Sequence, residues 1–165
     1  MLLCLKCGTE KPYSFQSYTC PECNSNLKYI GDNIKDTVLK FHNASLEISY
    51  ALADVNNFGG RDKHKVYICI GIARPYPPVV FRELPEGFKY VFMKDYSMDR
   101  SSYLPVELLI STVRTDGLLY FDAEYTGRDE ADTVLTQKIQ EIDKWIDDIV
   151  ADGWLAICNL GGFLD

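Results

Sequence analysis

Four cysteines near the N-terminus constrain the fold of this chain more than any other feature. They are spaced C-x2-C-x12-C-x2-C, as Cys4, Cys7, Cys20 and Cys23. In each C-x-x-C pair a tight turn directs two thiolates to one point, and two such pairs complete a tetrahedral shell around Zn²⁺. Gly8 can adopt the positive φ angle that such turns often need, and Pro21 favours a tight turn. The spacing therefore predicts one zinc ion held by four cysteines, with no position left for water.

Two short segments resemble the knuckles of a zinc ribbon: Cys4-Leu5-Lys6-Cys7-Gly8 and Cys20-Pro21-Glu22-Cys23. The resemblance covers residues 1–30 and implies a structural Zn²⁺ in a small antiparallel β unit. Zinc ribbons contact nucleic acids, dock proteins or only stabilise a fold, so the resemblance selects no function. Two disulfides, or an iron site of the rubredoxin type, are the alternatives. Cytosolic thiols stay reduced, and rubredoxins have a much longer spacer, so zinc is preferred.

The length and composition allow a second, larger unit after the cysteines. The chain has 165 residues, of which 47% are hydrophobic and 25% charged, values near those of ordinary globular proteins. A segment of about 30 residues cannot hold a core unaided, whereas the remainder can. We expect a zinc ribbon over residues 1–30 and an α+β domain over residues 31–165.

The hydrophobic pattern predicts two helices and several strands after residue 30. Spacings of three and four residues predict a helix over 33–56, although alternation from Leu46 to Leu52 fits a strand over part of that segment. The stripe from Leu135 to Ile149 predicts a second helix, which Gly153 ends. Strands are predicted at 65–74, 79–81, 88–93, 107–114, 118–125 and 154–160, with a hairpin at Asp116-Gly117 and a loop over 95–105. The expected class is α+β, an N-terminal zinc ribbon followed by a mainly antiparallel sheet packed with two helices.

The negative charge is concentrated in one segment. The chain has 24 acidic and 17 basic residues, a net charge of −7. From Asp122 to Asp152 there are ten acidic residues and three basic ones, which accounts for the whole net charge. Asp147, Asp148 and Asp152 fall near the end of the second predicted helix, where the helix dipole disfavours anions. They predict a surface that docks a basic partner, with a merely solvated helix face as the alternative.

Other residues add weaker signals. Tyr96 and Tyr103 lie in a predicted loop whose composition is typical of protein interfaces, with aromatic side chains that cap a sheet edge as the alternative. Cys69 and Cys158 sit in apolar runs and are expected to be buried. The sequence has no phosphate-binding loop, no dinucleotide fingerprint and no Gly-x-Ser-x-Gly motif, so it offers no recognisable catalytic set.

Three functions remain open on these observations. The preferred one is a non-enzymatic protein-binding module, by analogy of composition an inhibitor or immunity-type protein, whose partner has a basic surface. The second is a nucleic-acid-associated regulator that uses the zinc ribbon, for which residues 11–18 supply aromatic side chains and residues 61–65 supply basic ones. The third is an enzyme of unidentified type. Because no signal peptide and no membrane span are evident, we expect a cytoplasmic protein.

Overall fold

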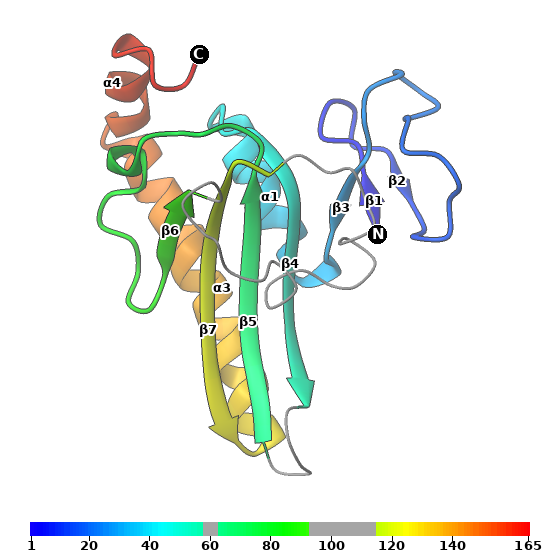
Figure 1. The fold of residues 1–165 in the computed structure, drawn as a ribbon, viewed down its shortest axis with the longest axis vertical. Coiled ribbons are helices and arrows are strands. Elements are labelled where there is room, and N and C mark those ends of the chain that lie inside the picture. The colour runs from blue at the N-terminus through cyan, green and yellow to red at the C-terminus, as the bar shows by residue number, and fades with distance from the viewer. Residues whose placement is uncertain (58–62, 93–114) are drawn as a thin grey trace.

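The computed structural model describes residues 1–57, 63–92 and 115–165. Its strands are β1 (Leu2–Leu3), β2 (Glu10–Lys11), β3 (Lys28–Ile30), β4 (Ile48–Asn57), β5 (Lys63–Ile72), β6 (Lys89–Phe92) and β7 (Gly117–Thr126). They form one open sheet in the order β2-β1-β3-β4-β5-β7-β6 (Figure 1). Strands β3 and β4 run parallel, and every other neighbouring pair is antiparallel. The predicted α+β class with a mainly antiparallel sheet is confirmed.

The helices of the described residues are α1 (Lys35–Asn43), α3 (Arg128–Ala151) and α4 (Trp154–Leu160), with 3-10 turns η1 (Asp32–Ile34) and η2 (Pro78–Phe81). Three α-helices therefore stand in this part of the chain, where two were predicted. Helices α1 and α3 lie against the same face of the sheet, behind β4, β5 and β7 in the view of Figure 1. Helix α4 follows α3 near the C-terminus.

The main core lies between this sheet face and the two helices. Ile68 and Ile70 of β5 are fully buried in one cluster with apolar residues of α1 and α3, among them Phe41. The Trp145 ring of α3 lies 6.0 Å from the Phe41 ring and 6.3 Å from the Phe81 ring, centroid to centroid. These contacts join η2, α1 and α3 into one apolar layer.

A smaller cluster occupies the opposite face of the sheet. Its buried members come from β4, β5 and β7: Tyr50, Leu52, Cys69, Leu118 and Tyr120. Gly71 is paired with Tyr50 across β4 and β5. A Cβ atom on Gly71 would lie 2.3 Å from the Tyr50 ring, which is far inside van der Waals contact. The glycine therefore makes the space that the tyrosine fills.

The prediction of one helix over 33–56 is wrong. The segment forms η1, α1 and then β4. Ser45 has a φ angle of 66°, and the N–H of Leu46 donates to the carbonyl of Phe41 at 3.0 Å. This reversal is typical of a helix C-terminus. The first six residues of β4 are all buried, so their mostly apolar sequence satisfies helical and strand spacing equally well.

The predicted strands at 154–160 and 79–81 are also wrong, because these residues form α4 and η2. In α4 the buried residues Leu155 and Cys158 are three apart, which is helical spacing. Pro78 begins η2, and a proline at the first helical position fits a helical turn.

The remaining predictions about secondary structure are largely confirmed. The strand at 65–74 is β5, that at 88–93 is β6 and that at 118–125 is β7. The second helix is α3, and Gly153 ends it with a φ angle of 77°. The predicted loop 95–105 and strand 107–114 lie outside the described residues, so the hairpin at Asp116-Gly117 is described only on its β7 side.

Candidate metal centre

The four N-terminal cysteines lie on two turns of the same kind. In the first turn the N–H of Gly8 donates to the carbonyl of Cys4 at 2.8 Å, and in the second the N–H of Asn24 donates to that of Cys20 at 2.9 Å. Gly8 has a φ angle of 76° and Asn24 one of 58°. The positive φ expected at Gly8 is confirmed. The equivalent role of Asn24 was missed, although asparagine is the residue after glycine that best tolerates this conformation.

The sulfur atoms of the two turns face one another across a small space. The Sγ atoms of Cys4 and Cys23 are 3.4 Å apart, and those of Cys7 and Cys20 are 3.6 Å apart. One ligand atom from each of the four residues lies within 4.8 Å of all the others. A tetrahedron with metal–sulfur bonds of about 2.3 Å has sulfur–sulfur edges of about 3.8 Å. The arrangement therefore fits one metal ion between four sulfur donors.

The surroundings of the cysteines differ from one sulfur to the next. Cys4 and Cys20 are completely buried, whereas Cys7 is exposed. Burial raises the pKa of the Cys4 thiol to about 12. Hydrogen bonds from the hydroxyl and backbone N–H of Ser25 lower the pKa of Cys23 to about 6. A metal ion requires thiolates, so its binding would displace the proton of Cys4 in particular.

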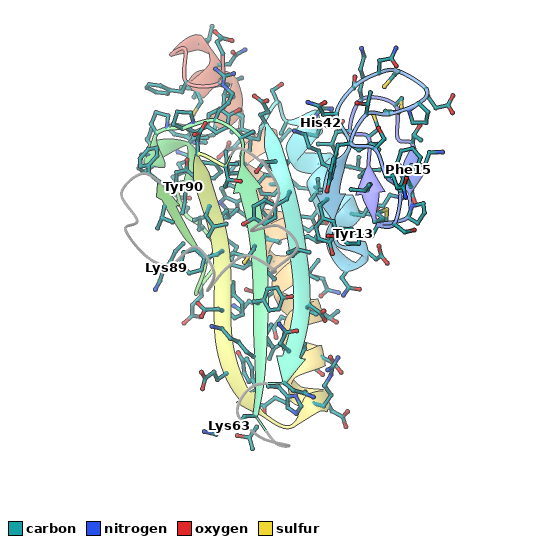
Figure 2. All side chains as sticks on the ribbon, turned by 45° about the vertical axis from the view of Figure 1, so that its right-hand side comes forward. Tyr13, Phe15, His42, Lys63, Lys89 and Tyr90 are labelled. Atoms are coloured by element: carbon teal, nitrogen blue, oxygen red, sulfur yellow. The ribbon has the colours of Figure 1, made fainter. Side chains whose placement is uncertain are left out.

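Apolar residues close around the two turns. Leu2 and Leu27 are buried with Cys4 and Cys20 in a separate small cluster, against which the Phe15 ring packs. The Phe15 and Tyr13 side chains both lie on this N-terminal part of the molecule (Figure 2). The ring of Tyr13 meets that of Tyr29 edge-on, 5.0 Å between centroids.

The sheet continues from the cysteine cluster into the rest of the molecule. The β3 residues Tyr29 and Ile30 pair with β4, and Ile30 belongs to the main core. The N-terminal amine of Met1 donates to the Ile30 carbonyl at 3.0 Å, and Lys35 of α1 forms an ion pair with Glu10 of β2. These contacts hold the candidate metal centre against β4 and α1. The division of the chain into 1–30 and 31–165 stays a prediction.

The three aspartates predicted to bind a partner each have a cation of the same chain beside them. Asp147 forms an ion pair with Lys40 of α1 at 2.6 Å, and Asp152 forms one with Arg82 at 2.7 Å. Asp148 pairs with Lys144 one turn away on α3. Sequence reasoning missed Lys40 and Arg82, because no local spacing links them to residues that are about 107 and 70 positions away.

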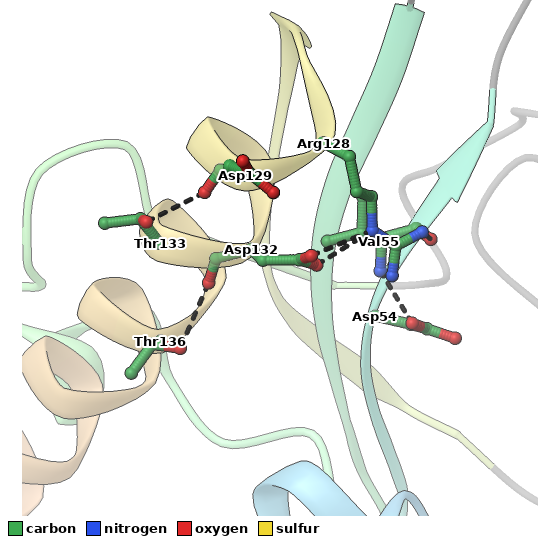
Figure 3. Close-up of polar contacts among 7 residues, drawn as sticks. All are labelled: Asp54, Val55, Arg128, Asp129, Asp132, Thr133 and Thr136. Carbon is green, nitrogen blue, oxygen red and sulfur yellow. Dashed lines mark hydrogen bonds and ion pairs between the residues drawn. The ribbon is translucent and has the colours of Figure 1, made fainter. Parts of the chain in front are cut away.

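The acidic residues at the start of α3 have other contacts than those at its end. Arg128 donates from Nε to both carboxylate oxygens of Asp132 at 3.0 Å, and its guanidinium also donates to the Val55 carbonyl at 3.3 Å (Figure 3). The hydroxyl of Thr133 donates to the backbone carbonyl of Asp129 at 2.8 Å. Negative charge is favourable in this first helical turn. These acids therefore have a local structural explanation, whereas Asp147 and Asp152 at the end of α3 are paired with residues distant in the sequence.

Most of the other candidate residues of the sequence lie outside the described residues, in the core or in an ion pair. Tyr96 and Tyr103 lie outside the described residues. Cys69 and Cys158 are buried as expected, and burial raises the pKa of both thiols, that of Cys69 to about 12. Of the basic cluster 61–65, His64 is buried and Lys65 forms an ion pair with Asp122 at 3.0 Å. Within residues 1–57, 63–92 and 115–165, no helix has both the length and the apolar character to cross a membrane.

Comparisons with protein-family models, curated proteins and solved structures found no match to this chain. The likeness to a zinc ribbon thus rests on the four cysteines themselves, which the fold brings together as one site able to bind a metal ion.

Proposed function

We propose that this chain is a non-enzymatic protein-binding domain in which the four cysteines hold one structural zinc ion. Catalytic zinc sites keep one coordination position for water or substrate, whereas four cysteines fill all four positions. Sulfur donors in a tetrahedral set favour zinc or iron over calcium and magnesium, which take oxygen ligands. The ion would stabilise the two turns and the small cluster around them.

Metal analysis tests the zinc proposal directly. The protein is purified without added metal or chelator, and its zinc and iron contents are measured per chain. We expect one zinc ion, and we expect Cys4→Ser with Cys23→Ser to remove it. The matched control is Cys69→Ser, a buried cysteine outside the cluster, which keeps the ion. Iron instead of zinc, or free thiols without metal, would overturn the proposal.

The protein-binding proposal rests on the exposed carboxylates at the end of α3. The side chains of Asp147, Asp148 and Asp152 are 58%, 61% and 48% exposed although each is in an ion pair. Exposed ion pairs of this kind contribute about 0–1 kcal/mol, so a partner's cations can replace the chain's own at little cost. Opposite charges also accelerate the encounter of two proteins. We therefore propose a partner with a basic surface, as an inhibitor or immunity-type protein would have.

A neutralisation series tests this surface. A partner protein is first recovered from an extract of the source cells, purified, and titrated against the chain at several salt concentrations. Asp147→Asn, Asp148→Asn and Asp152→Asn together should weaken binding and flatten its dependence on salt. The control variant removes the same charge from the start of α3, by Asp129→Asn, Glu130→Gln and Asp132→Asn. Equal affinities for the two variants would contradict the proposal.

Nucleic-acid binding is the second candidate, and one observation favours it. Tyr13 and Tyr18 are 46% and 59% exposed near the metal centre, and the Lys11 ammonium lies 5.6 Å from the centre of the Phe15 ring. Exposed aromatic rings beside a cation can stack on unpaired bases. Fluorescence anisotropy with single- and double-stranded oligonucleotides at low salt tests this candidate, and an absence of binding there removes it.

A further inference from the structure

Helix α4 and the residues after it present an exposed apolar surface. Residues 153–164 include no charged side chain. Ile157 is 57% exposed, Leu160 90% and Phe163 42%, and we name these three residues the α4 patch. Ile157 and Leu160 are one helical turn apart and so share one side of the helix. Two exposed apolar side chains on one side of a short helix, with a third just beyond the end of the helix, are typical of an interaction site.

The α4 patch belongs to a well-anchored helix. The indole Nε1 of Trp154 donates to the carbonyl of Val80 at 3.3 Å, and the guanidinium of Arg82 lies 4.0 Å from the centre of the Trp154 ring. Leu155 and Cys158 are buried on the side of α4 that meets the main core. The exposure of Ile157 therefore does not result from a loosely attached helix.

The chain beyond α4 is also held in place. The N–H of Phe163 donates to the carbonyl of Cys158 at 3.0 Å, and that of Gly162 donates to Asn159 at 2.9 Å. With a φ angle of 70° at Gly162, this is a Schellman ending of the helix. Leu164 is buried again, and its carbonyl accepts a hydrogen bond from Arg74 at 3.1 Å. Leu160 is thus exposed although the helix before it and the residues after it are both held by hydrogen bonds and buried side chains.

The C-terminal part of the sequence that contains the α4 patch is mainly acidic. From residue 141 to residue 165 the sequence has six acidic residues and one basic residue. Three cations from elsewhere in the chain, Lys40, Arg74 and Arg82, reach this end of the molecule and already bond to its carboxylates or carbonyls. Even with them the balance is six acids against four bases. A ligand for this surface therefore needs apolar side chains flanked by positive charge.

We propose that the α4 patch binds a basic amphipathic helix of a partner protein. This inference rests on the proposed function and names the element of the partner that would be bound. Leucine or isoleucine side chains of that helix would cover Ile157 and Leu160, while its lysines or arginines approach Asp148 and Asp152. A second copy of the chain is the less suitable occupant, because two acidic surfaces would meet.

A designed peptide tests the proposal without a known partner. The probe is a fluorescent helical peptide with leucine on one face and lysine elsewhere, titrated against the full zinc-loaded chain by anisotropy. We expect Leu160→Glu to weaken binding more than tenfold, although it adds a negative charge that attracts the peptide. Ile157→Ser, which adds no charge, should weaken it several-fold. The control Tyr18→Glu adds the same charge to an exposed aromatic position near the metal centre and should leave binding unchanged.

Four results would overturn the proposal. The first is equal binding by Leu160→Glu and Tyr18→Glu, and the second is equal binding of a peptide in which glutamate replaces lysine. The third is a dimer in sedimentation equilibrium that Leu160→Glu dissociates, which would assign the α4 patch to a second copy of the chain. Fourth, if a natural partner binds Leu160→Glu normally but not the variant neutralised at Asp147, Asp148 and Asp152, the proposed function stands and only this inference fails.

Discussion

The N-terminal module (residues 1–30) and the body (the described residues from 31 to 165) are stabilised in different ways. In the module the separate buried cluster has four members, and two of them, Cys4 and Cys20, are candidate metal ligands. In the body a large apolar layer includes fully buried residues such as Phe41 and Ile68. A core of the first size does not stabilise a fold by itself, whereas one of the second does. We infer that the module would need a bound metal ion to stay folded, whereas the body would not.

The two regions nevertheless share a sheet and part of a core. Strand β3 pairs with β4 through two residues, and Leu3 and Ile30 of the module are buried in the main core. Unfolding caused by loss of a metal ion would therefore either stay within the two cysteine turns or extend into β4.

Removal of the metal should unfold the module and leave the body folded. A structural zinc ion contributes ~10 kcal/mol or more of apparent folding free energy to a small zinc site, so the turns cannot persist without it. We expect a chelator, or Cys4→Ser, to abolish hydrogen-exchange protection in residues 1–30 while β5 and α3 keep theirs. Exchange measured by mass spectrometry checks this. Parallel loss of protection in β5 would show that the two regions form one cooperative unit.

A cavity in the core of the body should have the opposite effect: it should destabilise the body and leave the metal site of the module intact. Phe41 of α1 is completely buried, and its ring lies against the Trp145 ring of α3. Phe41→Ala should therefore lower the free energy of unfolding by about 3–5 kcal/mol. The zinc content per chain should stay at one, because Phe41 belongs to the main core and not to the cluster around the cysteines. Urea unfolding and metal analysis on the same sample check both parts. Tyr18→Ala, at an exposed position, is the control with little expected effect.

The two regions also differ in how far the sequence predicts them. The cysteine turns follow from local spacing, because each turn is made by five consecutive residues and one pair of backbone groups. Strand β4 was mistaken for helix because spacings of three and four residues run across the whole segment 33–56, whereas the strand alternation covers only Leu46 to Leu52. Helix α4 was mistaken for a strand because a seven-residue apolar run has no periodicity long enough to decide.

Two glycines allow a matched test at the centre of the sheet and at the junction of the regions. Gly71→Ala would place a Cβ atom 2.3 Å from the buried Tyr50 ring, and overpacking of this kind costs about 1–3 kcal/mol. Gly31→Ala would meet only backbone atoms, the nearest at 3.5 Å, and the φ angle of −66° suits alanine. We expect Gly31→Ala to be neutral or slightly stabilising. Similar losses of stability for both variants in urea would contradict the register of β4 and β5.

The acidic end of α3 shows a third limit of sequence reasoning. Its excess of carboxylates was visible, but the cations beside Asp143, Asp147 and Asp152 come from α1 and from the residue after η2. Lys40 contacts both Asp143 and Asp147 at 2.6 Å and so joins α1 to α3. The same carboxylates therefore have a structural role within the body, which is compatible with a partner competing for the most exposed of them.

The smallest effect should be the dependence of the body's stability on alkaline pH. The Asp143 carboxylate, followed by that of Asp147, accepts hydrogen bonds from Lys40 and raises the pKa of its ammonium. The stabilisation is complete below the unfolded-state pKa of about 10.4 and is lost as the pH rises through the higher folded-state pKa. Lys40→Met lacks this contribution, so its urea midpoint should fall less than that of the native chain above about pH 10. Buried tyrosines such as Tyr50, whose pKa burial raises, lower the stability of both proteins in the same range. If the urea midpoints of the two proteins change in parallel with pH, Lys40 does not stabilise the contact between α1 and α3. The ion pairs of Lys40 with Asp143 and Asp147 would then have no structural role.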